Sequence, residues 1–155
     1  MGSEMCIRDR FADTPGDEDL RTLDAQTGDP AHNTTWEALA ILIALGAWRL
    51  PEHHKVSVEV RSDSMASIQM LFKLASRSPA LNLIAREIAL DAAELSAPLD
   101  VLTHIPGVSN IIPDHLSRLS APQSHQVPEC LRTVPRTIIK RRDPSFWTTK
   151  ADPHC

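Results

Sequence analysis

The sequence predicts an α/β fold in which two parallel strands are covered by helices. Residues 55–62 alternate Val with polar side chains, which is typical of a strand with one buried face. Residues 99–104 form a second short strand-like run, and the residues between the two runs carry apolar side chains at helical spacing. Because strands that are connected through helices run parallel with a right-handed crossover, we expect a parallel pair.

The first predicted helix precedes both strands and spans residues 34–50. Its side chains are apolar on nearly every side, so it should be buried on most of its faces. Asn33, Thr34 or Thr35 can cap its N-terminus, and Pro51 follows its end.

Two further helices are expected between the strands. Residues 64–76 and residues 79–96 both place apolar side chains at helical spacing. Pro79 fits the first turn of the second helix, and Pro98 ends it.

The second strand is followed by a predicted loop over residues 105–111, which contain Pro-Gly. Pro113 is then expected to open a last short helix over residues 115–119. The predicted order of elements is therefore α-β-α-α-β-α.

Charge divides the chain into three segments. Residues 1–33 hold eight acids and three bases. Residues 34–120 hold nine acids and seven bases, and residues 121–155 hold three acids and six bases. We expect the first segment to be a disordered acidic leader, of which residues 1–10 look like translated adapter sequence. The second carries nearly all periodic apolar residues and forms the predicted domain, since 155 residues have room for one core. The third is predicted to be a Pro-rich basic tail, mostly irregular, with its basic cluster at 140–142 solvated.

Composition excludes several classes of protein. The net charge of −4 argues against a protein that holds nucleic acid by bulk charge alone. Because the sequence has no apolar run of about 18 residues and no signal-peptide layout, we expect an intracellular protein, cytoplasmic or nuclear, without a membrane partner. The three cysteines are far apart and form no C-x-x-C motif, so neither a disulfide framework nor a zinc site is predicted.

The candidate chemical groups lie at the ends of predicted elements. Asp63 follows the first strand and His104 ends the second, and sites in parallel sheets form at the carboxyl ends of strands. Glu37 and Asp114 lie in the first turns of helices. Carboxylates from different elements that meet at one point suit Mg²⁺, and two such ions support phosphodiester hydrolysis. Each acid also has an ordinary explanation, because Glu37 and Asp114 favour a helix dipole and Asp63 can be an N-cap.

Four pieces of the sequence carry a more specific pattern. They are TWEALAI at 35–41, VRSDS at 60–64, HIPGVSN at 104–110 and DHLSR at 114–118. In order and spacing these pieces resemble the ribonuclease H region of retrotransposon reverse transcriptases, over about residues 34–120. The stretch from His104 to Arg118 is the most specific part of this pattern.

The resemblance implies a nuclease that hydrolyses the RNA strand of RNA–DNA hybrids with two Mg²⁺ ions, with Mn²⁺ as an alternative metal. Glu37, Asp63 and Asp114 match the metal-ligating acids of that family, and His104 matches the histidine that assists product release or proton transfer. The implied partners are an RNA–DNA hybrid or other nucleic acid, and the reverse transcriptase domain of a parent polyprotein. Ser64 stands where the family usually has Asn.

The front of the chain departs from the family. Members begin with three antiparallel strands, the first of which carries a further metal-ligating Asp, but residues 11–33 show no strand-like alternation. Asp13 is the only candidate, and it lies too close to Glu37 for three strands to fit between them. The resemblance therefore implies an N-terminally truncated member, with a partial ribonuclease H-like fold that lacks the first three strands and an impaired nuclease activity.

Two alternatives remain beside this hypothesis: a non-catalytic transposon remnant, and a small helical interaction domain with at most weak nucleic-acid binding. The nuclease hypothesis requires that the carboxylates of Glu37, Asp63 and Asp114 approach one another.

Overall fold

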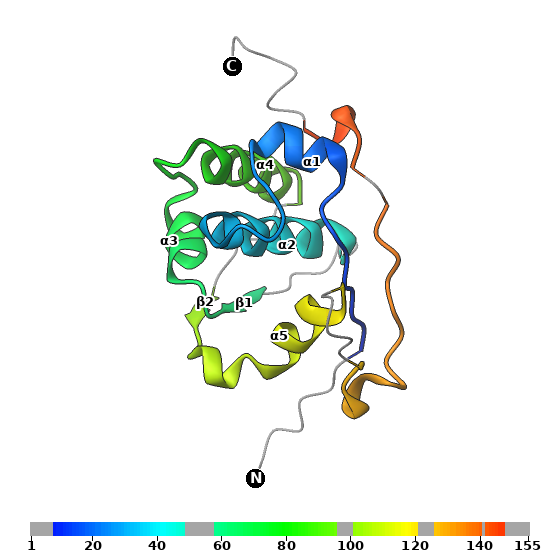
Figure 1. Cartoon of the computed structure of the whole chain (residues 1–155). Coiled ribbons are helices and arrows are strands. Elements are labelled where there is room, and N and C mark those ends of the chain that lie inside the picture. Colours follow the sequence, from blue (N-terminus) through cyan, green and yellow to red (C-terminus); the bar gives the residue numbers. More distant parts are fainter. Residues whose placement is uncertain (1–7, 49–57, 96–100, 121–125, 141, 148–155) are drawn as a thin grey trace.

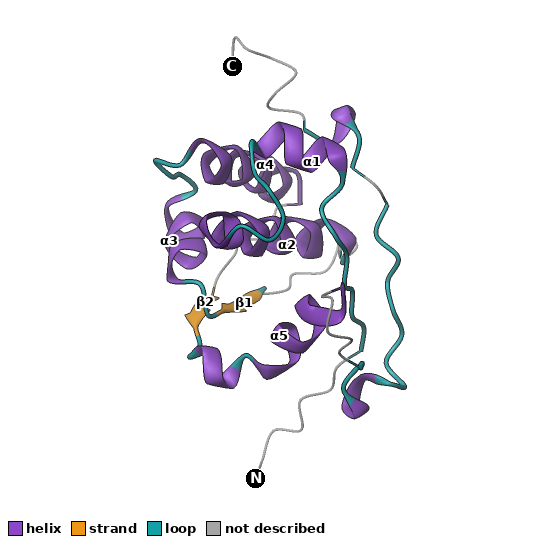
Figure 2. Ribbon diagram, viewed as in Figure 1, coloured by secondary structure: helices purple, strands orange, loops and turns teal. Residues whose placement is uncertain are grey.

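Five α-helices and a two-stranded parallel sheet form the part of the chain that the computed structural model describes (Figure 2). That part comprises residues 8–48, 58–95, 101–120, 126–140 and 142–147. The structure is therefore of the mixed α/β class that the sequence predicts.

The sheet consists of β1 (Glu59–Ser62) and β2 (Val101–His104), which pair in parallel from Glu59↔Val101 to Ser62↔His104. The predicted parallel pair is confirmed. Val58 lies outside β1, which therefore begins later than predicted. The predicted strand residues 55–57 and 99–100 lie outside the described residues. Polar side chains of the two strands form hydrogen bonds with one another, because Arg61 and Thr103 both donate to the Glu59 carboxylate.

Three helices cover the strands and supply most of the core. They are α2 (Asn33–Ala47), α3 (Met65–Lys73) and α4 (Pro79–Leu95). Helix α2 packs against both α3 and α4, and α3 also packs against the two strands. In Figure 1, α2 crosses the middle of the molecule between α4 and the strands. These helices contribute the following buried side chains to the hydrophobic core: Ala38, Leu39, Leu42, Ile43, Met70, Leu71, Leu81, Ile84, Ala85 and Ile88.

The N-terminus of α2 differs from its prediction. The helix begins at Asn33, and its N-cap residue is His32, so none of Asn33, Thr34 and Thr35 takes the capping position. A 3₁₀ turn over Pro30–His32, capped by the Asp29 side chain, runs directly into the helix and removes the need for a separate cap.

Helix α3 ends at Lys73 because Leu74 adopts a left-handed conformation, with φ of 47°. The helix predicted after Pro113 is α5 (Ile111–Ser117), and it begins two residues before that proline. The Asp114 amide donates to the Asn110 carbonyl and fixes the first turn, where a proline needs no N–H partner.

Both terminal segments lie against the rest of the molecule where the structure describes them. Residues 17–23, which belong to the predicted disordered leader, form α1 (Asp17–Leu23), and this helix packs against α4. The stretches around Arg10 and Arg136 form a parallel bridge, in which the Arg10 amide donates to the Pro135 carbonyl at 3.1 Å. Figure 1 shows these two stretches along one side of the molecule, in blue and orange.

Trp147 anchors the second of these segments in the core. Its side chain is 1% exposed and belongs to the same buried cluster as Leu23, Leu42 and Ile84. The hydrophobic core therefore extends beyond residues 34–120 at both ends. In the described residues, no helix is both long and apolar enough to cross a membrane.

Candidate functional site

Asp63 and His104 lie together at the carboxyl ends of the two strands. The register pairs Ser62 with His104, and Asp63 follows directly. The ring Nε2 of His104 lies 3.2 Å from the backbone oxygen of Asp63. Because a carbonyl oxygen only accepts, this contact requires the proton on Nε2. The Ile105 amide continues the pairing by donating to the Ser62 carbonyl at 3.0 Å.

The loop after β2 brings two further residues to Asp63. Asn110 Nδ2 donates to Asp63 Oδ1 at 2.9 Å. Gly107 lies beside the other oxygen, and a Cβ built on it would be in contact with Asp63 Oδ2 at 3.4 Å. The Asp63 carboxylate thus lies between the amide of Asn110 and the backbone of Gly107.

Sequence reasoning did not assign a role to Gly107 or Asn110. Both lie in the HIPGVSN string, which was the available signal. A short 3₁₀ turn over Gly107–Ser109 returns the chain toward β1, and its end places Asn110 beside Asp63.

The alternative that Asp63 caps α3 is wrong. Ser64 is the N-cap residue, and its hydroxyl oxygen accepts from the Ser67 amide at 3.3 Å. Ser62 supports this turn, because its hydroxyl oxygen accepts from the Ser64 amide at 3.1 Å. Ser62 and Ser64 thus stabilise the turn, and the Asp63 carboxylate accepts from Asn110 instead of capping the helix.

The other predicted acids have different surroundings. Asp114 lies in the first turn of α5, as its dipole explanation expects, and its carboxylate accepts from Arg118 Nε at 3.0 Å. Glu37 is exposed on α2. The structure therefore brings His104 and Asn110 to Asp63, while Asp114 is engaged with Arg118.

The expected meeting of Glu37, Asp63 and Asp114 is not found. In the described residues, which include all three, no group of three His, Cys, Asp or Glu side chains is placed to hold a metal ion. Two of these carboxylates have local partners instead. The Asp63 carboxylate accepts a hydrogen bond from Asn110, and the Asp114 carboxylate forms an ion pair with Arg118. The residues present do not fit the Mg²⁺ or Mn²⁺ pair that the family resemblance implies.

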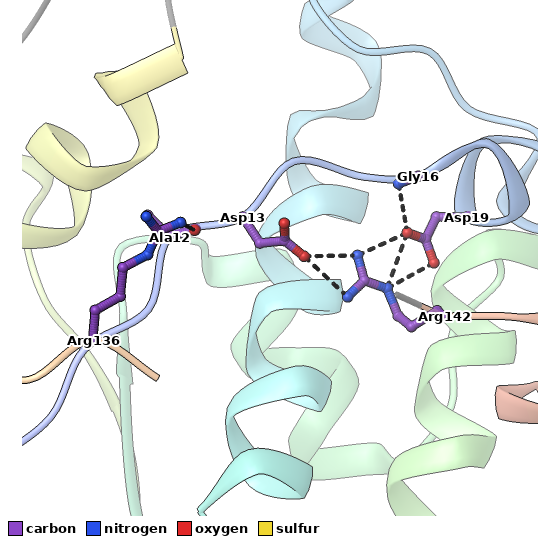
Figure 3. Close-up of polar contacts among 6 residues, drawn as sticks. All are labelled: Ala12, Asp13, Gly16, Asp19, Arg136 and Arg142. Atoms are coloured by element: carbon purple, nitrogen blue, oxygen red, sulfur yellow. Dashed lines mark hydrogen bonds and ion pairs between the residues drawn. The ribbon is translucent and has the colours of Figure 1, made fainter. Parts of the chain in front are cut away.

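A second polar centre joins the terminal segments (Figure 3). Arg142 reaches Asp19 on α1 and also Asp13, whose Oδ2 is 3.3 Å from Arg142 Nη1. Asp13, the only candidate for the family's first metal ligand, is thus paired with a cation. The sequence predicts that Arg142 belongs to a solvated basic cluster, but its side chain is 4% exposed.

Asp19 links this centre to the start of α1, because its Oδ2 also accepts from the Gly16 amide at 2.8 Å. The centre is thus a structural cluster in which two carboxylates share one guanidinium.

Comparisons with protein-family models, with curated proteins and with solved structures found no match to this chain.

Proposed function

We propose that residues 34–120 are a ribonuclease H-like region of a retroelement reverse transcriptase that binds nucleic acid weakly and does not efficiently hydrolyse RNA–DNA hybrids. The observation that supports this most directly is the hydrogen bond from Asn110 to Asp63. It joins the VRSDS and HIPGVSN pieces at the carboxyl ends of two parallel strands. Sites in parallel sheets form at that edge.

The impairment follows from the positions of the acids. Two-metal hydrolysis needs carboxylates that converge on one point, because the ions must stabilise the attacking and leaving oxygens together. Among the described residues, Glu37, Asp63 and Asp114 form no such group. We therefore favour the non-catalytic alternative over an active nuclease.

Weak binding is expected from the charge. Nucleic-acid affinity rests largely on cations that displace counterions from phosphates, and a chain with a net charge of −4 offers little bulk attraction. Contacts would come from local groups at the strand ends, including the amide of Asn110 and the ring of His104.

A cleavage assay tests this proposal. The full chain is incubated with a 5′-labelled RNA–DNA hybrid in Mg²⁺ and separately in Mn²⁺, beside an Asp63→Asn variant that is purified identically. We expect equal, background-level cleavage from both proteins. Metal-dependent cleavage that Asp63→Asn abolishes would show that the chain is an active nuclease.

A binding measurement tests the remaining part. Fluorescence anisotropy with the same hybrid should give weak binding that decreases moderately between low and moderate salt, because few phosphates are neutralised. An affinity that is unaffected by salt would contradict binding through phosphate contacts.

A further inference from the structure

The surface where α3 meets the start of α4 contains a hollow of about 490 Å³. Its lining residues are Ala66, Gln69, Met70, Lys73, Ala75, Ser76, Arg77 and Leu81. Met70 and Leu81 are largely buried and give it an apolar floor, while Lys73 and Arg77 place two cations at it. We call this hollow, together with the exposed Met65, Phe72 and Leu74 of the same segment, the α3 surface.

Large apolar side chains of the same segment are exposed. Phe72 is 80% exposed, Met65 49% and Leu74 40%. Met65, Gln69 and Phe72 are spaced as neighbours along one helix face, so the exposed apolar stripe adjoins the hollow through Gln69. Single exposed apolar residues are ordinary, but adjoining ones beside a hollow indicate an interaction site.

Charge distinguishes this surface from the rest of the chain. Residues 64–86 contain no Asp or Glu, although the whole chain has a net charge of −4. Lys73 and Arg77 are exposed, and neither forms an ion pair with a described residue. The surface thus offers two cations beside an apolar floor.

We propose that the α3 surface binds an acidic amphipathic helix of a protein partner. Apolar side chains on one face of such a helix would enter the hollow and cover Phe72, and acids flanking them would pair with Lys73 and Arg77. A second copy of this chain fits less well, because a two-fold interface would bring the same cations toward each other. Phosphates would engage the two cations but leave the apolar floor and Met65 without an apolar partner.

The α3 surface would bind such a helix whether or not residues 34–120 are ribonuclease H-like. Figure 1 shows α3 at one edge of the molecule, where a partner can approach it.

Fluorescence anisotropy with two labelled model peptides tests the proposal on the full chain. The first peptide is a helix of about five turns with Leu at the a and d positions of its heptads and Glu at flanking positions. The second keeps every Leu and replaces each Glu by Lys. We expect the acidic peptide to bind about tenfold or more tightly than the basic one, and its binding to weaken as salt is raised.

Two variants of the chain locate the binding. Lys73→Glu combined with Arg77→Glu should weaken binding of the acidic peptide about tenfold or more, because two attractions become repulsions. Phe72→Ser should weaken it about tenfold through lost apolar burial. Lys73, Arg77 and Phe72 are exposed, so these substitutions should not disturb the fold. Unchanged urea-unfolding midpoints of both variants would verify this.

The matched control is Arg132→Glu combined with Lys140→Glu, which changes the net charge equally at two exposed positions of the terminal segment. It should leave binding within about twofold of the unmodified chain.

Several results would overturn the proposal: no binding of the acidic peptide, equal binding of both peptides, or equal weakening by the control variant. Displacement of the peptide by an RNA–DNA hybrid would assign the surface to nucleic acid instead. Sedimentation that shows a dimer which Lys73→Glu with Arg77→Glu dissociates would assign it to a second copy.

Discussion

Arg142 Nε donates to both carboxylate oxygens of Asp19, at 2.8 Å and 2.9 Å, although the two residues lie 123 positions apart in the chain (Figure 3). Their side chains are 4% and 1% exposed. A paired, hydrogen-bonded charge is tolerated in such surroundings, whereas an unpaired one is costly. We therefore expect this pair to contribute strongly to the association of the two terminal segments.

Replacement of Arg142 by Met should destabilise the chain strongly. Asp19 would keep its bond from the Gly16 amide but lose its cation, and leaving one charge of a buried pair alone costs about 3–5 kcal/mol. Urea unfolding of the full chain measures the loss. Asp13→Asn serves as control, and it should cost at most about 1 kcal/mol because Asp13 is exposed.

A double variant separates the pair from its surroundings. Asp19→Asn combined with Arg142→Met should cost less than the sum of the single changes, since neither partner is then left charged and alone. Additive losses would contradict an energetic coupling between these two residues.

Trp147 should be as important as the ion pair. Its replacement by Ala is expected to cost about 3–5 kcal/mol, because it removes the largest fully buried side chain and leaves a cavity. Replacement by Phe should cost less, since the indole N–H has no hydrogen-bond partner in the described part of the chain. Urea midpoints compare them with Ile138→Ala, an 88% exposed position on the same segment that should be nearly neutral. An equal shift in all three variants would argue against a buried anchor.

The fold was predictable where local patterns determine it. Alternation at 58–62 and helical spacing at 65–73 and 79–95 are local properties, and the corresponding elements were found with shifted ends. The packing of the terminal segments against each other was not predictable from local patterns, because Arg142, the partner of Asp19, is 123 positions away in the chain. The start of α1 did have a local indication, since Gly16 and Asp19 have the spacing of a helix N-terminus.

The candidate site was predictable in part. Strand ends and the HIPGVSN string placed His104 near Asp63, because the register of a parallel pair follows from the strands. Side-chain direction was not predictable. The Asp114 carboxylate accepts from Arg118 one turn further along α5, and a sequence pattern alone does not distinguish this local partner from the strand ends.

Acid should loosen the terminal segments. The Thr137 hydroxyl lowers the pKa of Asp9, and the Ser145 hydroxyl and amide lower the pKa of Asp143. A lowered pKa in the folded state means that the stabilisation is present above the usual value of 3.8 and is lost as the pH falls through the lowered pKa.

Tryptophan fluorescence followed between about pH 5 and about pH 1 measures this change. Asp9→Asn combined with Asp143→Asn should lower stability at neutral pH and reduce its dependence on acid. An unchanged acid transition in that variant would show that other carboxylates control it.

Asn110 should hold the loop after β2 through the Asp63 carboxylate. Asn110→Ala removes the donor at 2.9 Å from Asp63 Oδ1, and a bond of this kind contributes about 1 kcal/mol at a half-buried position. Asn110→Asp should be worse at neutral pH, because two carboxylates would then face each other and the pKa of one would rise. Its deficit should diminish as acid protonates the pair, so thermal unfolding at neutral and acidic pH distinguishes the variants. A deficit that is the same at both pH values would mean that the residue at 110 does not face Asp63 in solution.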